Sequence, residues 1–326
     1  MKYKPKFFVF LGYGGENSIM PLYEYFTSRG AETLLVDDHR VPYEREEMLQ
    51  RLAEISNTHS ITLITSSHLW FDCKTYEFYN HFYDPNIIAP LEFLDQFHPD
   101  MTVYYPHDMG VFMHESEIPF IDQFDLILVP YRNNMYYKLL NTCKQVEVVG
   151  WIKKRQETSI PEGIQGCKPV FFPSNVPNLY NKLGVDGFAQ WFRDYIGPEI
   201  PIKMAFGDNG IMPILSQEGY TFLDSSVSVY DAIASHNMVI GSGNSSIIFE
   251  AAYSGIPTVA LLDGIMPDEE NLKELKGIPG VYPLHPEELQ DFIKSVNAGK
   301  RTLHAGPNVL IPFEFERVFD LLNAEN

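Results

Sequence analysis

Apolar runs alternate with stretches of helical periodicity along most of the chain. Phe7–Leu11 is apolar throughout and is followed by glycines, a helical stretch and a second apolar run at Glu32–Asp37. A strand, a turn, a helix and a strand in this order form one βαβ unit of a parallel sheet. Continuous hydrophobicity is typical of parallel strands, because both faces of such a sheet are covered. The pattern therefore predicts an α/β protein.

Further apolar runs predict more buried strands in both halves of the chain. In the first half these runs are Ile61–Thr65, Met101–Tyr105, Asp125–Pro130 and Val146–Val149. In the second half they are Pro169–Pro173, Ile202–Phe206, Tyr220–Leu223, Met238–Ile240 and Pro257–Leu262. Helical stretches lie between most of them, and one continuous helix is predicted over Val176–Tyr195.

A break separates the two halves. From Gly150 to Lys168 the chain carries glycines, a proline and charged residues and has little apolar periodicity. Such a stretch is typical of a domain boundary. We therefore expect two Rossmann-like domains, at residues 1–152 and 153–326, and a last helix at Phe313–Leu322 that could pack back on the first domain.

Size and charge narrow the function. A chain of 326 residues, 45% of them hydrophobic, is large enough for two packed domains. The net charge of −19 repels polyphosphate, so we expect neither nucleic acid nor an anionic membrane surface as a partner. Cys73, Cys143 and Cys167 form no CxxC pair, which indicates reduced thiols and a cytoplasmic location. No apolar run approaches the ~18 residues of a membrane-spanning helix, and a homodimer is compatible with these properties.

The most informative stretch lies in the second half. A predicted strand ends in glycines and serines, a helix starts at once, and Gly255 and Pro257 end that helix. Such a bend suits an anion, because glycines let the backbone approach a phosphate and hydroxyls add donors. Glu250, further along the helix, could accept hydrogen bonds from a ribose diol. The alternative is that the glycines only permit a tight turn and Ser245 caps the helix.

This stretch resembles the donor-binding segment of GT-B glycosyltransferases and of the related UDP-N-acetylglucosamine 2-epimerases. Four parts of it fall onto that segment in order: Asn237–Ile240, Gly241–Ser246, Glu250–Ala251 and Gly255–Pro257. The first position is asparagine where the family usually has aspartate. The resemblance implies a GT-B fold, with two Rossmann-like domains facing each other across a cleft. It also implies that the bend binds the donor diphosphate and that Glu250 binds the ribose.

The resemblance extends to other segments. The donor-binding residues that it implies in the bend are Gly241, Ser242, Gly243, Asn244, Ser245 and Ser246. Ser225 and Ser226 lie in the stretch that leads into the donor helix, and Phe206 and Gly207 follow a predicted strand where a loop could reach the nucleobase. The loop after the first strand is similar to the acceptor-side loop of the undecaprenyl muropeptide N-acetylglucosaminyltransferase type. Its candidate acceptor residues are Gly14, Gly15, Glu16 and Asn17.

The catalytic candidates follow a strand of the first half. His107 and Asp108 come after Met101–Tyr105, at the sheet edge where ligands bind in such folds. A histidine could remove the proton of an acceptor hydroxyl, although a loop histidine that caps a carbonyl is an equal alternative. Some GT-B glycerophosphate transferases carry His-Gly at a comparable point, and Asp108 takes the glycine position here.

Neither a metal nor a dinucleotide is expected as a cofactor. Asp37, Asp38 and His39 have no second cluster to complete a metal site. The glycines after the first strand do not form a GxGxxG fingerprint. We therefore predict a metal-independent glycosyltransferase of polysaccharide or glycoconjugate biosynthesis, which moves a sugar or related activated group from a nucleoside diphosphate to an unknown acceptor hydroxyl. The alternatives are a nucleotide-sugar 2-epimerase or hydrolase of the same fold and a non-catalytic nucleotide-sugar-binding protein.

Overall fold

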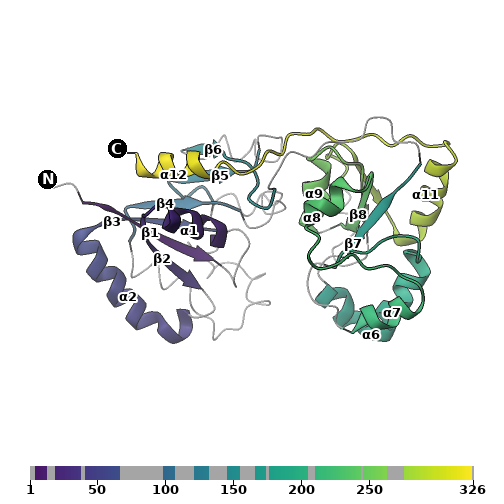
Figure 1. Ribbon diagram of the computed structural model, residues 1–326, viewed down its shortest axis with the longest axis horizontal. Coiled ribbons are helices and arrows are strands. Elements are labelled where there is room, and N and C mark those ends of the chain that lie inside the picture. Colours follow the sequence, from purple (N-terminus) through teal and green to yellow (C-terminus); the bar gives the residue numbers. More distant parts are fainter. Residues whose placement is uncertain are drawn as a thin grey trace. The chain divides into compact units, whose positions relative to one another are not determined.

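The chain forms two compact units in the computed structural model. Unit 1 comprises Met1–Arg155 and Ile311–Asn326, and unit 2 comprises Gln156–Leu310 (Figure 1). The C-terminal residues thus belong to the unit that the first half of the chain builds. The structure describes residues 4–12, 19–37, 41–66, 98–106, 121–131, 145–154, 166–173, 176–204, 210–243, 245–262 and 275–324.

Unit 1 is built on a parallel sheet of six strands in the order β2-β1-β3-β4-β5-β6. The strands are β1 (Lys6–Gly12), β2 (Glu32–Asp37), β3 (Ser60–Thr65), β4 (Met101–Tyr104), β5 (Leu126–Val129) and β6 (Val146–Val148). β1, β3, β4 and β5 are buried along nearly their whole length, as their apolar runs predict. The described helices of unit 1 are α1 (Ile19–Ser28), α2 (Val41–Thr58) and α12 (Phe315–Asn323).

The C-terminal helix α12 is attached to unit 1 by aromatic and ionic contacts. Phe319 packs against Phe26 of α1, with ring centroids 5.0 Å apart, and Arg29 lies over the Phe319 ring. Glu316 accepts hydrogen bonds from Tyr25 at 2.7 Å and from Arg29 at 2.6 Å. The glycine at position 150 permits the close approach of this returning chain, because a Cβ there would lie 2.3 Å from the Pro312 carbonyl oxygen.

Unit 2 contains a second parallel sheet in the order β10-β9-β8-β7. Its strands are β7 (Pro169–Phe172), β8 (Met238–Ser242), β9 (Thr258–Leu261) and β10 (Val281–Leu284). Parallel bridges join Phe171 to Ile202 and Ile202 to Phe222, and so extend the sheet beyond β7. Numbered along the chain, the six segments lie in the order 3-2-1-4-5-6 of a Rossmann sheet. The predicted class, two Rossmann-like α/β domains, is confirmed.

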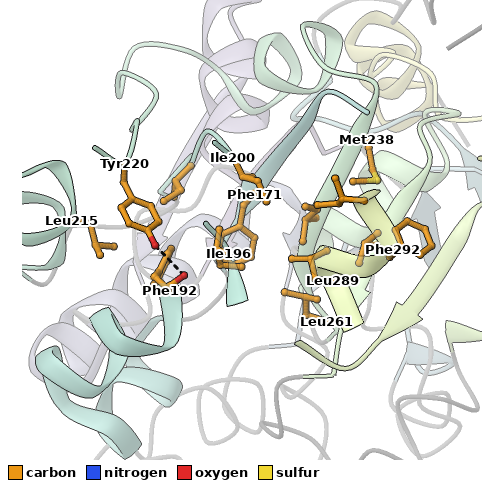
Figure 2. Close-up of a cluster of buried hydrophobic side chains, with 14 of the residues drawn as sticks. Phe171, Phe192, Ile196, Ile200, Leu215, Tyr220, Met238, Leu261, Leu289 and Phe292 are labelled. Atoms are coloured by element: carbon orange, nitrogen blue, oxygen red, sulfur yellow. Dashed lines mark hydrogen bonds between the residues drawn. The ribbon is translucent and has the colours of Figure 1, made fainter. Parts of the chain in front are cut away.

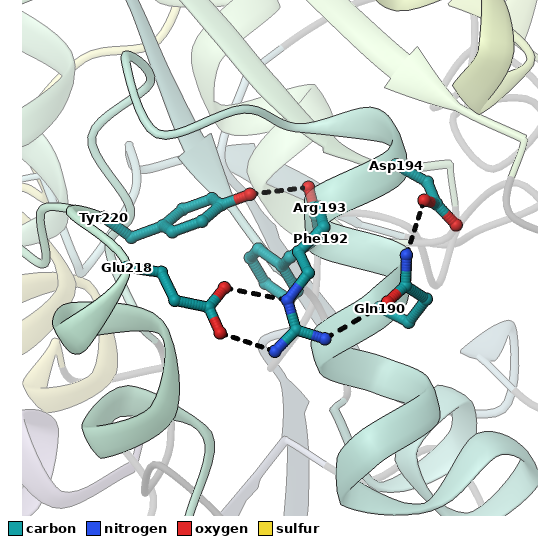
Figure 3. Close-up of polar contacts among 6 residues, drawn as sticks. All are labelled: Gln190, Phe192, Arg193, Asp194, Glu218 and Tyr220. Carbon is teal, nitrogen blue, oxygen red and sulfur yellow. Dashed lines mark hydrogen bonds and ion pairs between the residues drawn. The ribbon is translucent and has the colours of Figure 1, made fainter.

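The helices of unit 2 cover this sheet and complete its core. Those within the described residues are α6 (Val176–Tyr195), α7 (Ile211–Gln217), α8 (Val229–Ala234), α9 (Ser246–Ala252) and α11 (Leu289–Asn297), with a short 3-10 helix η6 at Pro286–Glu288. Figure 2 shows Phe171 of β7 between α6 residues such as Phe192 and the Leu289 and Phe292 side chains of α11. Arg193 of α6 donates two hydrogen bonds to Glu218 after α7, and the Tyr220 hydroxyl donates to the Phe192 carbonyl (Figure 3).

Several predicted elements of unit 2 differ in the structure. Among the described residues of Ile202–Phe206 and Tyr220–Leu223, one residue of each run forms a bridge in place of a strand. Turns at Gly219 and Asp224 lie directly before and after the second run, so the extended segment between them is short. α6 is interrupted at Gly184, whose φ of 71° is not helical. β10 was not predicted, because this edge strand is half-buried and contains Pro283.

Candidate functional site

The strand order of unit 2 reverses between β7 and β8. The segments that follow β7 in the chain, at Ile202 and Phe222, lie on one side of it, whereas β8, β9 and β10 lie on the other. In open α/β sheets a ligand binds outside the carboxyl ends of the strands at such a switch point. β8 ends there at Ser242, so the bend that the sequence singles out is at the switch point of its sheet.

Gly241 has a packing role at this bend. A Cβ on this residue would lie 2.8 Å from Cγ2 of Ile247 and 3.1 Å from Cδ1 of Ile248. Both isoleucines are buried on α9, so the missing side chain lets this helix approach the end of β8. This contact accounts for the glycine at 241 without a ligand.

Two backbone amides of the bend have partners within the protein. The Gly243 N–H donates to the Leu261 carbonyl at 2.8 Å, and the Ser245 N–H donates to the Ser242 carbonyl at 3.0 Å. Ser245 is half-buried, and its side chain makes no capping hydrogen bond to α9. The two amides are thus used within the protein, whereas the Ser245 hydroxyl does not cap α9 and stays a candidate donor to an anion.

Glu250 is buried, with 3% of its surface exposed. Its Oε1 accepts a hydrogen bond from the Ser246 hydroxyl at 3.2 Å, and its Oε2 accepts one from the Tyr230 hydroxyl at 3.0 Å. Tyr230 belongs to α8, which lies beside α9 (Figure 1). The carboxylate that the resemblance assigns to a ribose thus joins two helices within unit 2.

Ser225 and Ser226 lie in a tight turn that a buried lysine holds. The Val227 N–H donates to the Asp224 carbonyl at 3.1 Å, and the Ser226 N–H donates to the Asp224 carboxylate at 2.8 Å. The Lys203 ammonium donates to the Asp224 carbonyl at 2.9 Å and to the Ser225 carbonyl at 3.3 Å. Hydrogen bonds from Ser226, and then the Lys203 charge, lower the pKa of Asp224. Both serines are exposed, so their hydroxyls are accessible.

The remaining predicted site residues lie outside the described part of the chain. They are the catalytic candidates His107 and Asp108, the donor candidates Phe206, Gly207 and Asn244, and the acceptor-side residues Gly14, Gly15, Glu16 and Asn17. β1 ends at Gly12, just before the acceptor-side loop, and β4 ends at Tyr104, three residues before His107. Their roles stay predictions.

Sequence reasoning did not identify two residues that shape the site. They are Lys203, which holds the turn at Ser225, and Tyr230, which bonds to Glu250. Lys203 follows a strand segment at the carboxyl edge of the sheet, which is a signal that could have marked it. Tyr230 carries no such signal, because its contact with Glu250 depends on how α8 and α9 pack.

Two further properties concern the whole described chain. Within the ranges that the structure describes, no three His, Cys, Asp or Glu side chains are grouped so that they could hold a metal ion. No helix in the same ranges has the length and apolar character needed to cross a membrane.

Cys167 is a free thiol whose Sγ lies 3.4 Å from the Met238 Sδ, and burial raises its pKa to about 11.

Comparisons with solved structures agree with this fold. S. aureus MnaA in complex with UDP superposes with a TM-score of 0.53 at 12% identity, over 98% of this chain and 96% of that one. UDP-GlcNAc 2-epimerase from Methanocaldococcus jannaschii has a TM-score of 0.47 at 12% identity, over 97% and 99% of the two chains. Acinetobacter baumannii MurG has a TM-score of 0.42 at 13% identity, over 97% and 99%.

The likeness to MnaA supports the class of fold and no more. At such identities a shared architecture does not carry an activity with it. No family model and no curated protein matches the sequence. The chain has the GT-B fold, in which two Rossmann-like domains follow one another.

Proposed function

We propose that this protein is a GT-B glycosyltransferase that moves a sugar, or a related activated group, from a nucleoside diphosphate to an acceptor hydroxyl. The observation that carries the proposal is the position of the serine-containing bend, at the switch point of a 3-2-1-4-5-6 parallel sheet. The full-length likeness to MnaA, which was solved with UDP, supports a nucleotide ligand for this fold.

The donor half of the proposed site belongs to unit 2. The Ser245 hydroxyl would donate to the diphosphate. The turn at Ser225 and Ser226 follows the bridge at Phe222 and so lies at the same edge of the sheet. The Ser225 hydroxyl is its further candidate donor, because the Ser226 side chain already bonds to Asp224. Neutral donors of this kind stabilise a leaving diphosphate without a bound metal ion.

The catalytic and acceptor-side candidates belong to the sequence of unit 1. His107 would take the proton of the acceptor hydroxyl as its oxygen attacks the anomeric carbon. The bond from that carbon to the diphosphate oxygen breaks in the same step, and the nucleoside diphosphate leaves with the bonding electron pair. Asp108 and the residues Gly14, Gly15, Glu16 and Asn17 would position the acceptor. We expect the reaction to take place in the cytoplasm and to serve polysaccharide or glycoconjugate synthesis.

The test is an assay of nucleotide release from UDP-, CDP- and GDP-sugars, with and without a panel of acceptor sugars. Transfer predicts that release depends on an acceptor and that the acceptor gains one sugar by mass spectrometry. Release that needs no acceptor would indicate a hydrolase, and a changed sugar configuration without release would indicate an epimerase. Saturable binding with no turnover would indicate a protein that only binds nucleotide sugars.

A further inference from the structure

The starting point is the hydrogen bond that the Ser246 hydroxyl donates to Glu250. A hydroxyl has one proton and two lone pairs, and a carboxylate only accepts. Because Ser246 uses its proton on Oε1 at 3.2 Å, it presents lone pairs in its other directions. A phosphate oxygen is also an acceptor, so Ser246 in this state cannot donate to a diphosphate. It can accept a hydrogen bond from a ligand hydroxyl.

The carboxylate is held from its other side. The Tyr230 hydroxyl donates to Oε2 at 3.0 Å, and both Tyr230 and Glu250 are buried, with 7% and 3% of their surfaces exposed. Ser246 is half-buried, so it lies at the accessible end of this chain of three side chains. A buried polar network of this kind fixes the direction of each hydrogen bond, because an unmade one is costly at low dielectric.

We propose that Glu250 acts on the ligand through Ser246, as a positioning residue, and that Tyr230 positions Glu250. Ser246 is then the residue that accepts a hydrogen bond from a ribose hydroxyl of the donor. This assignment rests on the proposed function. It differs from what the resemblance implies, because there Ser246 binds the diphosphate and Glu250 binds the ribose directly. It predicts that preference for ribose over dideoxyribose depends on the Ser246 hydroxyl.

The experiment compares the binding of UDP, CDP and GDP with that of their 2′,3′-dideoxy forms by calorimetry. The wild-type protein should bind the ribose form of its nucleotide roughly ten-fold more tightly, as expected for one hydrogen bond from a hydroxyl to a polarised acceptor. Ser246→Ala should bind both forms equally. Tyr230→Phe should reduce the preference, because Glu250 then holds Ser246 less firmly.

Tyr220→Phe is the matched control. Tyr220 is also 7% exposed in unit 2, and its hydroxyl donates to the Phe192 carbonyl at 3.1 Å rather than to the site. It should retain the wild-type preference. A wild-type preference in Ser246→Ala, or a Tyr230→Phe variant that behaves like Tyr220→Phe, would overturn the assignment. If the wild-type protein bound none of the nucleotides, the proposed function would fail instead, and with it the ligand of Ser246.

Discussion

The two ends of the strands differ in what their polar residues do. At the amino ends, carboxylate and amide side chains bond to the backbone of the neighbouring strand. At the carboxyl end of the second sheet, polar side chains meet hydroxyls or turn carbonyls, and some remain accessible, such as Ser225 and Ser245. This agrees with the rule that ligands of parallel sheets bind at the carboxyl ends, and it separates residues that stabilise from residues that are candidates for binding.

The amino-end contact recurs in both units. Asp100, just before β4, accepts a hydrogen bond from the Ile61 N–H at 2.8 Å. Asp125, just before β5, accepts from the Thr102 N–H and from the Thr102 hydroxyl, each at 2.9 Å. Asn237, just before β8, accepts from the Lys168 N–H at 2.6 Å. In each case the side chain accepts a backbone hydrogen bond at the point where two adjacent parallel strands begin.

This contact explains the asparagine at 237. Its Oδ1 makes the same bond that aspartate makes in unit 1, and its Nδ2 also donates to the Gly166 carbonyl at 3.0 Å. An aspartate could not make the second bond. The first position of the donor-like segment is therefore structural, whereas the positions after β8 are the candidates for ligand contact.

The largest expected effect is a loss of turnover when His107, which follows β4, is replaced. His107→Ala should lower the rate of sugar transfer roughly 10²–10⁴-fold, because the acceptor hydroxyl loses its base. The melting temperature should stay close to that of the wild-type protein. Transfer assays under saturating donor provide the measurement, and near-normal turnover would remove His107 from the mechanism.

Next in size is a loss of stability at the amino end of β5. Asp125→Ala should lower the free energy of unfolding by about 1–3 kcal/mol, because the buried Thr102 amide loses its acceptor. Chemical denaturation measures this loss. Asp125→Asn keeps an acceptor oxygen and is the control, and it should recover most of the stability. A nucleotide affinity that changed in Asp125→Ala would contradict the division between the two ends.

A smaller loss is expected for Asn237→Asp. The carboxylate keeps the bond from Lys168 and loses the donation to Gly166, so unfolding should become easier by about 0.5–1 kcal/mol. Asn237→Ala loses both bonds and should be less stable than Asn237→Asp. If both variants melted like the wild-type protein, the explanation of this asparagine would be wrong.

The smallest expected effect is a pH dependence from His236, which precedes Asn237. Its ring is buried and its Nδ1 lies 2.7 Å from the Ala232 carbonyl. Burial, and then the Lys168 charge, lower its pKa below the ordinary 6.5, although the bond to Ala232 opposes the shift. The unfolded chain therefore binds more protons, so stability that is present above pH ~6.5 is lost as the pH falls. Thermal melts at pH 7.5 and 5.5 should show a larger drop for the wild-type protein than for His236→Gln.

The elements with long apolar runs could be predicted from the sequence, and the contacts between elements could not. β1, β3 and β8 follow from their hydrophobic runs, and the bend after β8 follows from its glycines and serines. The partners of Glu250 do not, because Tyr230 is twenty residues away and meets it only through the packing of α8 on α9. The Lys203 clamp likewise depends on a turn formed 21 residues later.

The central claim is that the carboxyl edge of the second sheet binds a nucleoside diphosphate, and calorimetric titration of the wild-type protein and Ser245→Ala with UDP, CDP and GDP tests it most directly. We predict saturable binding of at least one nucleotide by the wild-type protein and affinity about ten-fold lower in Ser245→Ala. Absence of binding to all three, or equal affinity in both proteins, would contradict it.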